Sequence, residues 1–210
     1  MIKITKGIVY AGLVALGTML GGQTVEAQTY ASLPSQTLPA ATEGEARPIQ
    51  GWVDFCRRMP SECAFDPDGP AVVQLTARNW ATMVSINNRV NNAVTAMTDE
   101  EHWGVADRWD LPTDGAGDCE DFQILKRHLL AKEGFPRRAM RMTVVIDGEG
   151  EGHAVLMIRT DRGDYILDNK RGAILPWFQT GYVYVKRESE HRLGWASLGR
   201  AVSPTITANR

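Results

Sequence analysis

The sequence lacks a charge excess of either sign. Its 210 residues carry 23 Lys and Arg against 25 Asp and Glu, and the net charge is −2. No positive field is available to hold nucleic acid or an anionic membrane surface. Internal repeats are also lacking, and cysteine is scarce, with three in the whole chain. We therefore expect no nucleic-acid partner and no membrane association of the mature protein.

Long apolar runs are scarce as well, and the clearest one lies at the start of the chain. The run Ile8–Leu20 follows Lys3 and Lys6 and precedes the small-residue site at Ala27. This is the three-part layout of a secretory signal peptide. A membrane anchor is the alternative, but the run is shorter than the ~20 residues that span a bilayer. We predict a signal peptide over residues 1–27, cleaved after Ala27, and an exported protein.

The rest of the chain has the length of one domain with a proper core. Residues 28–50 are rich in Ala, Thr, Pro and Gln and poor in large apolar side chains, which predicts a disordered leader. Order is expected to begin at residue 51. The predicted domain covers residues 51–190, and residues 191–210 are expected to form a C-terminal tail.

Two of the three cysteines, Cys56 and Cys63, lie close together in the sequence. In an exported protein this spacing favours a disulfide. Two free thiols or a metal pair are the alternatives, although no further metal ligands lie nearby. A disulfide between them would leave Cys119 unpaired in an oxidising compartment.

Cys119 lies at the start of a predicted helix. Gly115 and Gly117 precede it, and Asp118 occupies the expected N-cap position. Partial positive charge and free N–H groups at a helix N-terminus favour a thiolate and can hold an oxyanion. This placement suits a nucleophile, while the alternative is a small buried cysteine. Apolar residues recur at helical spacing behind it, at Phe122, Leu125, Leu129 and Leu130.

The pattern changes from helical to alternating along the chain. One long helix is predicted over residues 71–97, before the helix that begins at Cys119. The C-terminal half then predicts strands over residues 140–146, 153–159, 164–168 and 182–186. Helices followed by an antiparallel meander indicate the α+β class.

The predicted strands carry an imidazole and a carboxylate. If they pair through the turn at 161–163, His153 lies opposite residue 170 and therefore close to Asp168. Cysteine, histidine and aspartate in this order supply a nucleophile, a base and a group that orients the base. The alternatives are a strand-edge histidine without a task and a plain turn at Asp168.

Several of these motifs resemble those of the bacterial transglutaminase-like cysteine peptidases, which include the LapG-type periplasmic proteases. The resemblance runs from about residue 52 to residue 177. It implies a papain-like α+β fold, with Cys119 as nucleophile, His153 as base and Asp168 as the orienting group. It also implies a protein substrate and a periplasmic or secreted location. The matching segments are 117–121, Lys126, 152–155 and 167–169, with 55–63 similar to a subgroup of exported members.

The resemblance also implies a cofactor. LapG-type members bind calcium through acidic residues beside the cysteine, and these match Asp118, Glu120 and Asp121. A divalent cation would offset the repulsion between these carboxylates and a Cys119 thiolate. All-oxygen ligands favour calcium or magnesium over zinc. Alternatively, the acids only stabilise the helix N-terminus.

Together these features predict an exported thiol endopeptidase that acts on proteins through a thioester intermediate. An acyl transferase or amidase of the same fold would form the same thioester, since water and an amine compete for it. A periplasmic binding module without turnover is the third interpretation. The presence of all three residue types, Cys119, His153 and Asp168, counts against it.

Overall fold

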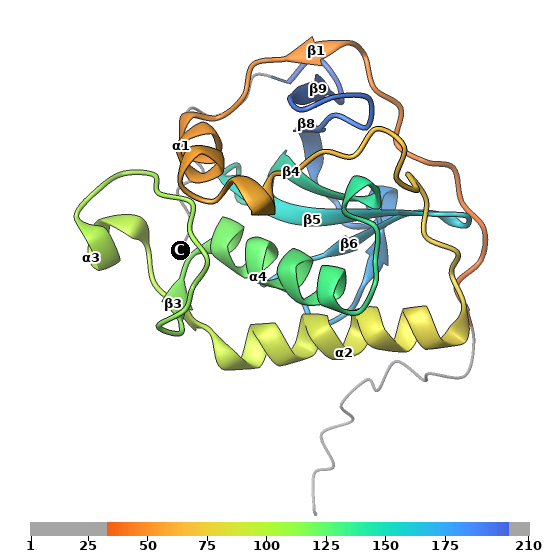
Figure 1. Cartoon of the computed structure of the whole chain (residues 1–210), viewed down its shortest axis with the longest axis horizontal. Coiled ribbons are helices and arrows are strands. Elements are labelled where there is room, and N and C mark those ends of the chain that lie inside the picture. The colour runs from red at the N-terminus through yellow and green to blue at the C-terminus, as the bar shows by residue number, and fades with distance from the viewer. Residues whose placement is uncertain (1–32, 202–210) are drawn as a thin grey trace, which may run out of the picture.

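The computed structural model of the chain describes residues 33–201 and shows helices packed against one antiparallel sheet (Figure 1). The sheet is built from β1 (Glu45–Ala46), β4 (Met140–Ile146), β5 (Gly152–Thr160), β6 (Gly163–Leu167), β7 (Leu175–Pro176), β8 (Val183–Glu188) and β9 (Trp195–Ser197). The α-helices are α1 (Gln50–Arg58), α2 (Ala77–Ala93), α3 (Asp99–Trp103) and α4 (Cys119–Lys132). Shorter elements are the parallel pair β2 (Thr95–Ala96) and β3 (Ala116–Gly117), and the 3-10 helices η1 (Pro60–Glu62), η2 (Arg137–Ala139) and η3 (Trp177–Gln179).

The predicted α+β class is confirmed, and so is the pairing of β5 with β6. Leu156 faces Leu167 and Thr160 faces Gly163, which is the register predicted from the turn. Gly163 adopts a φ of +109°, a left-handed conformation that glycine allows at this turn. The strand order β1-β9-β8-β4-β5-β6-β7 differs from a simple meander, because β8 returns across the sheet to pair with β4.

The two faces of the sheet bury different cores, as strand alternation requires. On the helix side, Leu156 and Ile158 pack with residues of α2 and α4 in the larger hydrophobic cluster. On the opposite side, Val155 and Met157 pack with Ala40 in a smaller cluster. Burial of both faces explains why β4, β5 and β6 contain so few exposed side chains.

Helix α4 lies between α2 and the sheet, and contacts both (Figure 1). It begins after the N-cap residue Asp118, as predicted. It ends near Gly134, whose φ of +87° turns the chain so that Phe135 N donates to Leu130 O at 3.0 Å. Helix α2 is shorter than the predicted 71–97. Thr76 caps its start by accepting from Asn79 N, and β2 begins at Thr95.

The described parts of the predicted leader and tail contact the sheet. The described part of the leader, residues 33–50, runs along the sheet. Thr37 N donates to Arg162 O at 2.8 Å, and Ala40 N donates to Asp164 Oδ2 at 2.8 Å. Strand β1 then pairs with β9, which lies in the predicted tail. Backbone hydrogen bonds order these segments although their side chains are largely small or polar.

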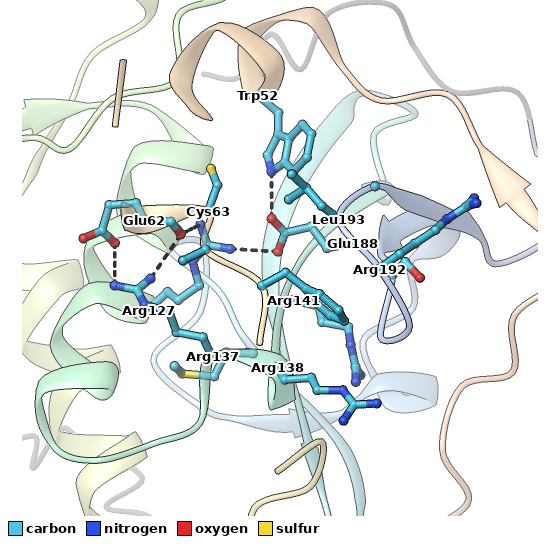
Figure 2. A pocket seen from close by; sticks show the side chains of 15 residues that line it. Trp52, Glu62, Cys63, Arg127, Arg137, Arg138, Arg141, Glu188, Arg192 and Leu193 are labelled. Atoms are coloured by element: carbon cyan, nitrogen blue, oxygen red, sulfur yellow. Dashed lines mark hydrogen bonds and ion pairs between the residues drawn. The ribbon is translucent and has the colours of Figure 1, made fainter. Parts of the chain in front are cut away.

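Cys56 and Cys63 form the predicted disulfide, with an S–S distance of 2.01 Å. The closed loop is short, so its contribution to stability is roughly 2–3 kcal/mol by chain entropy. Figure 2 shows how this region attaches to the rest of the molecule. Arg127 of α4 donates to Glu188 of β8 at 2.7 Å and to the Glu62 carbonyl at 3.1 Å, and Trp52 Nε1 donates to Glu188 at 2.7 Å.

The predicted signal peptide, residues 1–27, lies outside the described residues. Among residues 33–201, no helix combines the length and apolar character that a membrane span requires.

Candidate active site

Cys119 is the first residue of α4, and its side chain is buried, with 1% of its surface exposed. The N–H of Ala154, on β5, donates to its Sγ atom at 3.2 Å. The thiol donates in turn to Glu120 Oε2, also at 3.2 Å. The start of α4 is therefore in direct contact with the start of β5, next to His153.

The structure joins His153 and Asp168 as the strand register predicted. His153 Nε2 lies 2.8 Å from Asp168 Oδ1, and both side chains are almost fully buried. Tyr182 donates its hydroxyl to Asp168 Oδ2 at 2.6 Å, and Lys170 N donates to Oδ1 at 3.0 Å. Burial alone would raise the pKa of Asp168, but the hydrogen bonds from His153 and Tyr182 lower it to about 2.

The other ring nitrogen of His153, Nδ1, is not engaged by Asp168. Nδ1 is buried and has no hydrogen-bond partner among the residues that the structure describes. His153 directly precedes Ala154, whose N–H contacts Cys119 Sγ. With Nε2 engaged by Asp168, Nδ1 is the ring nitrogen available to exchange a proton with Cys119.

Three buried carboxylates gather at the N-terminus of α4. Asp99, Asp118 and Glu120 each offer one oxygen, and these oxygens lie within 4.8 Å of one another. Asp118 Oδ1 and Glu120 Oε1 have no hydrogen-bond partner within residues 33–201. Burial, more than the neighbouring acids, raises the pKa of Asp118 to about 7 and raises the pKa of Glu120 well above its ordinary value.

Asp121, also predicted as a ligand, is held differently. Its Oδ1 accepts from Asp110 N at 2.7 Å, and burial raises its pKa to about 9. Asp99 is the third member of the carboxylate group and was not predicted from the sequence. In the sequence it reads as one of three acids in the first turn of α3. Only the pairing of β2 with β3 brings its neighbourhood to Asp118.

These carboxylates are a chemically suitable cation site. Unpartnered buried oxygens are unfavourable unless a proton or a cation occupies them. The donors are all oxygen, which suits calcium or magnesium. Asp99, Asp118 and Glu120 are the residues that would hold such an ion.

A cavity of about 480 Å³ opens beside Cys119. Its wall comes from the segment between β2 and α3, from the start of α4 and from the residue after Asp168. The lining residues are Ala96, Met97, Thr98, Glu100, Glu101, Asp118, Cys119 and Asn169. The smaller cavity of Figure 2, about 40 Å³, is lined by none of Cys119, His153 and Asp168. We therefore take the larger one as the candidate substrate cleft.

A helix that begins with a buried thiol and packs on a sheet carrying a paired imidazole and carboxylate defines the class of papain-like cysteine enzymes. The family model described as bacterial transglutaminase-like cysteine proteinase, BTLCP, matches residues 42–202. The chain belongs to this family, and the resemblance noted in its motifs is confirmed. The match extends beyond the predicted domain, 51–190, at both ends.

Solved structures of related proteins are similar over part of the chain. Calcium-bound LapG of Legionella pneumophila is 27% identical, with 59% of this chain and 72% of that chain covered and a TM-score of 0.49. The EGTA-treated form of the same protein is 28% identical, covers 53% and 63%, and has a TM-score of 0.46. A candidate cysteine protease from Cytophaga hutchinsonii is 15% identical, covers 76% and 62%, and has a TM-score of 0.42. No curated protein matches the chain.

The buried carboxylates predict how stability depends on pH. Because the folded-state pKa values of Asp118 and Asp121 are raised to about 7 and about 9, these two groups bind more protons in the folded protein than in the unfolded chain from pH ~4 to pH ~9. In calcium-free buffer, the free energy of unfolding should therefore fall by at least about 1 kcal/mol between about pH 5 and pH 9. Urea titrations measure it.

The matched pair of variants is Asp118→Asn and Asp68→Asn, since Asp68 is exposed. Asp118→Asn should flatten the pH dependence, and Asp68→Asn should leave it as in the wild type. A free energy of unfolding that stays constant or rises over this range would contradict the assignment.

Proposed function

We propose that the protein is a thiol endopeptidase that cleaves protein substrates through a thioester on Cys119. One observation carries the proposal: His153 is bonded to Asp168 through Nε2, while Nδ1 is left without a partner beside the residue that contacts Cys119 Sγ. Membership of a cysteine proteinase family supports the reaction class. The cavity beside Cys119 supports access by an extended peptide.

In this mechanism His153 Nδ1 takes the thiol proton, and the thiolate attacks the scissile carbonyl carbon. The N–H groups of the first turn of α4 lack intrahelical partners and face the developing oxyanion. The imidazolium then gives its proton to the departing amine, which leaves a thioester. Water attacks the thioester, again through His153, and the acid is released as the thiol re-forms. Asp168 holds the Nε2–H form of the ring and stabilises the imidazolium.

The acids beside Cys119 oppose the first of these steps. Burial, followed by the charges of Glu120 and Asp118, raises the pKa of Cys119 well above its ordinary value. In the structure the thiol donates to Glu120 instead of to His153 Nδ1. We infer that calcium held by Asp99, Asp118 and Glu120 regulates the enzyme. When bound, calcium would supply positive charge that offsets the carboxylates and engages Glu120.

We further propose that the protein acts outside the cytoplasm, in the periplasm or after secretion. The disulfide between Cys56 and Cys63 supports an oxidising compartment. The charged start, apolar run and small-residue site of residues 1–27 support export by a signal peptide.

Substitution of the three site residues tests the mechanism. Cys119→Ala should abolish cleavage, since the other two cysteines of the chain, Cys56 and Cys63, form the disulfide. His153→Ala and Asp168→Asn should each lower the rate on the order of 10²–10⁴-fold, because the base or its orientation is lost. Mass spectrometry of periplasmic proteins incubated with wild type or Cys119→Ala identifies the products.

His191→Ala is the matched control, because the His191 side chain is 78% exposed, and this variant should cleave like the wild type. New isopeptide bonds in place of cut peptides would contradict hydrolysis and indicate acyl transfer. Unchanged cleavage by Cys119→Ala would exclude the thiol mechanism altogether.

Removal of calcium tests the regulation. A calcium chelator should slow both proteolysis and alkylation of Cys119 by iodoacetamide, because the carboxylates then disfavour the thiolate. Asp99→Asn, Asp118→Asn and Glu120→Gln should each weaken the response to added calcium, and Asp68→Asn should not. If chelation leaves both rates unchanged, calcium control is wrong even where the thiol mechanism stands.

N-terminal sequencing of the exported protein tests its processing. Cleavage after Ala27 should give a chain that begins Gln28-Thr29-Tyr30. A mature protein that retains residues 1–20 would contradict cleavage and favour a membrane-tethered enzyme.

A further inference from the structure

Lys126 is a buried cation to which the mechanism assigns no role. It lies on α4 seven residues after Cys119, two helical turns along the same face. Its side chain has no exposed surface, and its Nζ atom has no hydrogen-bond partner among the described residues. Lysine is almost never fully buried without a partner, because the loss of hydration is expensive. The burial of Lys126 therefore requires an explanation.

Three amide side chains, two of them buried and that of Asn91 half-buried, hold the segment 168–172, which begins with Asp168. Asn91 Nδ2 donates to the Asp168 carbonyl at 2.8 Å, and Asn87 Nδ2 donates to the Gly172 carbonyl at 3.0 Å. Gln123 Nε2, from α4, donates to Asn169 Oδ1 at 3.3 Å. All three amide groups therefore donate their N–H hydrogen bonds to this one segment.

The oxygen atoms of the same three amides accept no hydrogen bond from the described residues. Asn87 Oδ1, Asn91 Oδ1 and Gln123 Oε1 are buried and have no hydrogen-bond partner within the described part of the chain. An ammonium group carries three donors and no acceptor, and each amide oxygen only accepts. The three N–H donors of the Lys126 ammonium group thus equal the three amide oxygens in number and complement them as donors.

Electrostatics connects Lys126 to the same segment. Burial lowers the pKa of Lys126 to about 7, and the one charge that opposes this shift is that of Asp168. Strongly perturbed buried groups are characteristic of functional sites. A neutral amine keeps two of its donors, so the amide oxygens retain donors from Lys126 in either protonation state.

We propose that Lys126 is a positioning residue for the carboxylate that orients His153. From inside α4, its Nζ group satisfies the amide oxygens of Asn87, Asn91 and Gln123 through bridging water, and so fixes the segment 168–172. Asp168 is thereby held against His153 Nε2. This inference rests on the proposed function only in the role that it gives to Asp168.

An apolar residue of similar length cannot replace this group. Lys126→Met would keep the volume but leave three buried amide oxygens without a donor. The segment 168–172 would then gain freedom to move, and Asp168 would no longer fix the ring of His153. The helix offers a matched control, Lys132→Met, because Lys132 lies on the last turn of α4 and is exposed.

The experiment uses the full-length protein in calcium-containing buffer, with the disulfide intact. The rate of Cys119 alkylation by iodoacetamide reports the thiol, because the other two cysteines of the chain form the disulfide. The ¹⁵N shifts of the His153 ring report which nitrogen carries the proton. Lys126→Met should slow alkylation at least tenfold and convert His153 from the Nε2–H form to a mixture of forms. Lys132→Met should change neither.

Two results would overturn the proposal. One is an unchanged alkylation rate in Lys126→Met. The other is a slower rate with the Nε2–H form of His153 intact, which would make Lys126 a purely electrostatic or structural group. Circular dichroism checks folding, and if Lys126→Met does not fold, Lys126→Leu carries the same test, since it also removes every donor.

His153→Asn separates this proposal from the proposed function. It should slow alkylation whether or not Lys126 acts as a positioning residue. If His153→Asn reacts like the wild type, the proposed mechanism fails, and the readout then shows this independently of Lys126.

Discussion

The contact between the first turn of α4 and the start of β5 is the constraint on which the site depends. The Ala154 N–H reaches Cys119 Sγ at 3.2 Å, so helix and sheet meet where the thiol lies. This close approach buries the helix N-terminus, and the acids beside Cys119 are buried with it. The same approach sets His153, one residue earlier on β5, beside the thiol.

Burial at this contact concentrates charge in an unusual way. Carboxylates gather at the N-terminus of α4, where the helix dipole favours them but loss of hydration does not. Two turns later, Lys126 is buried on the same helix. Apolar side chains would stabilise a simple scaffold helix better at these positions. The buried carboxylates and Lys126 are consistent with a helix that takes part in the proposed chemistry at one end and positions Asp168 further along.

Much of this arrangement was predictable from local patterns. Alternation at the start of residues 140–146, followed by β-branched residues, predicted β4, and a glycine turn set the register that joins His153 to Asp168. Asp99 was not predictable, because a two-residue parallel pair, β2 with β3, carries no periodic signal. The order of residues 33–50 was missed for a related reason: backbone hydrogen bonds to the sheet hold this segment, and composition does not reveal them.

The sequence by itself determined the α+β class, the helix that begins at Cys119, the disulfide partners and the residue types of the site. These follow from helix caps, side-chain period and spacing, which act over a few residues. Tertiary structure alone decided which acids meet, which ring nitrogen of His153 stays free and where Lys126 is buried. Each of these depends on contacts between segments far apart in the chain, whose energies come from burial and close packing and leave no local pattern.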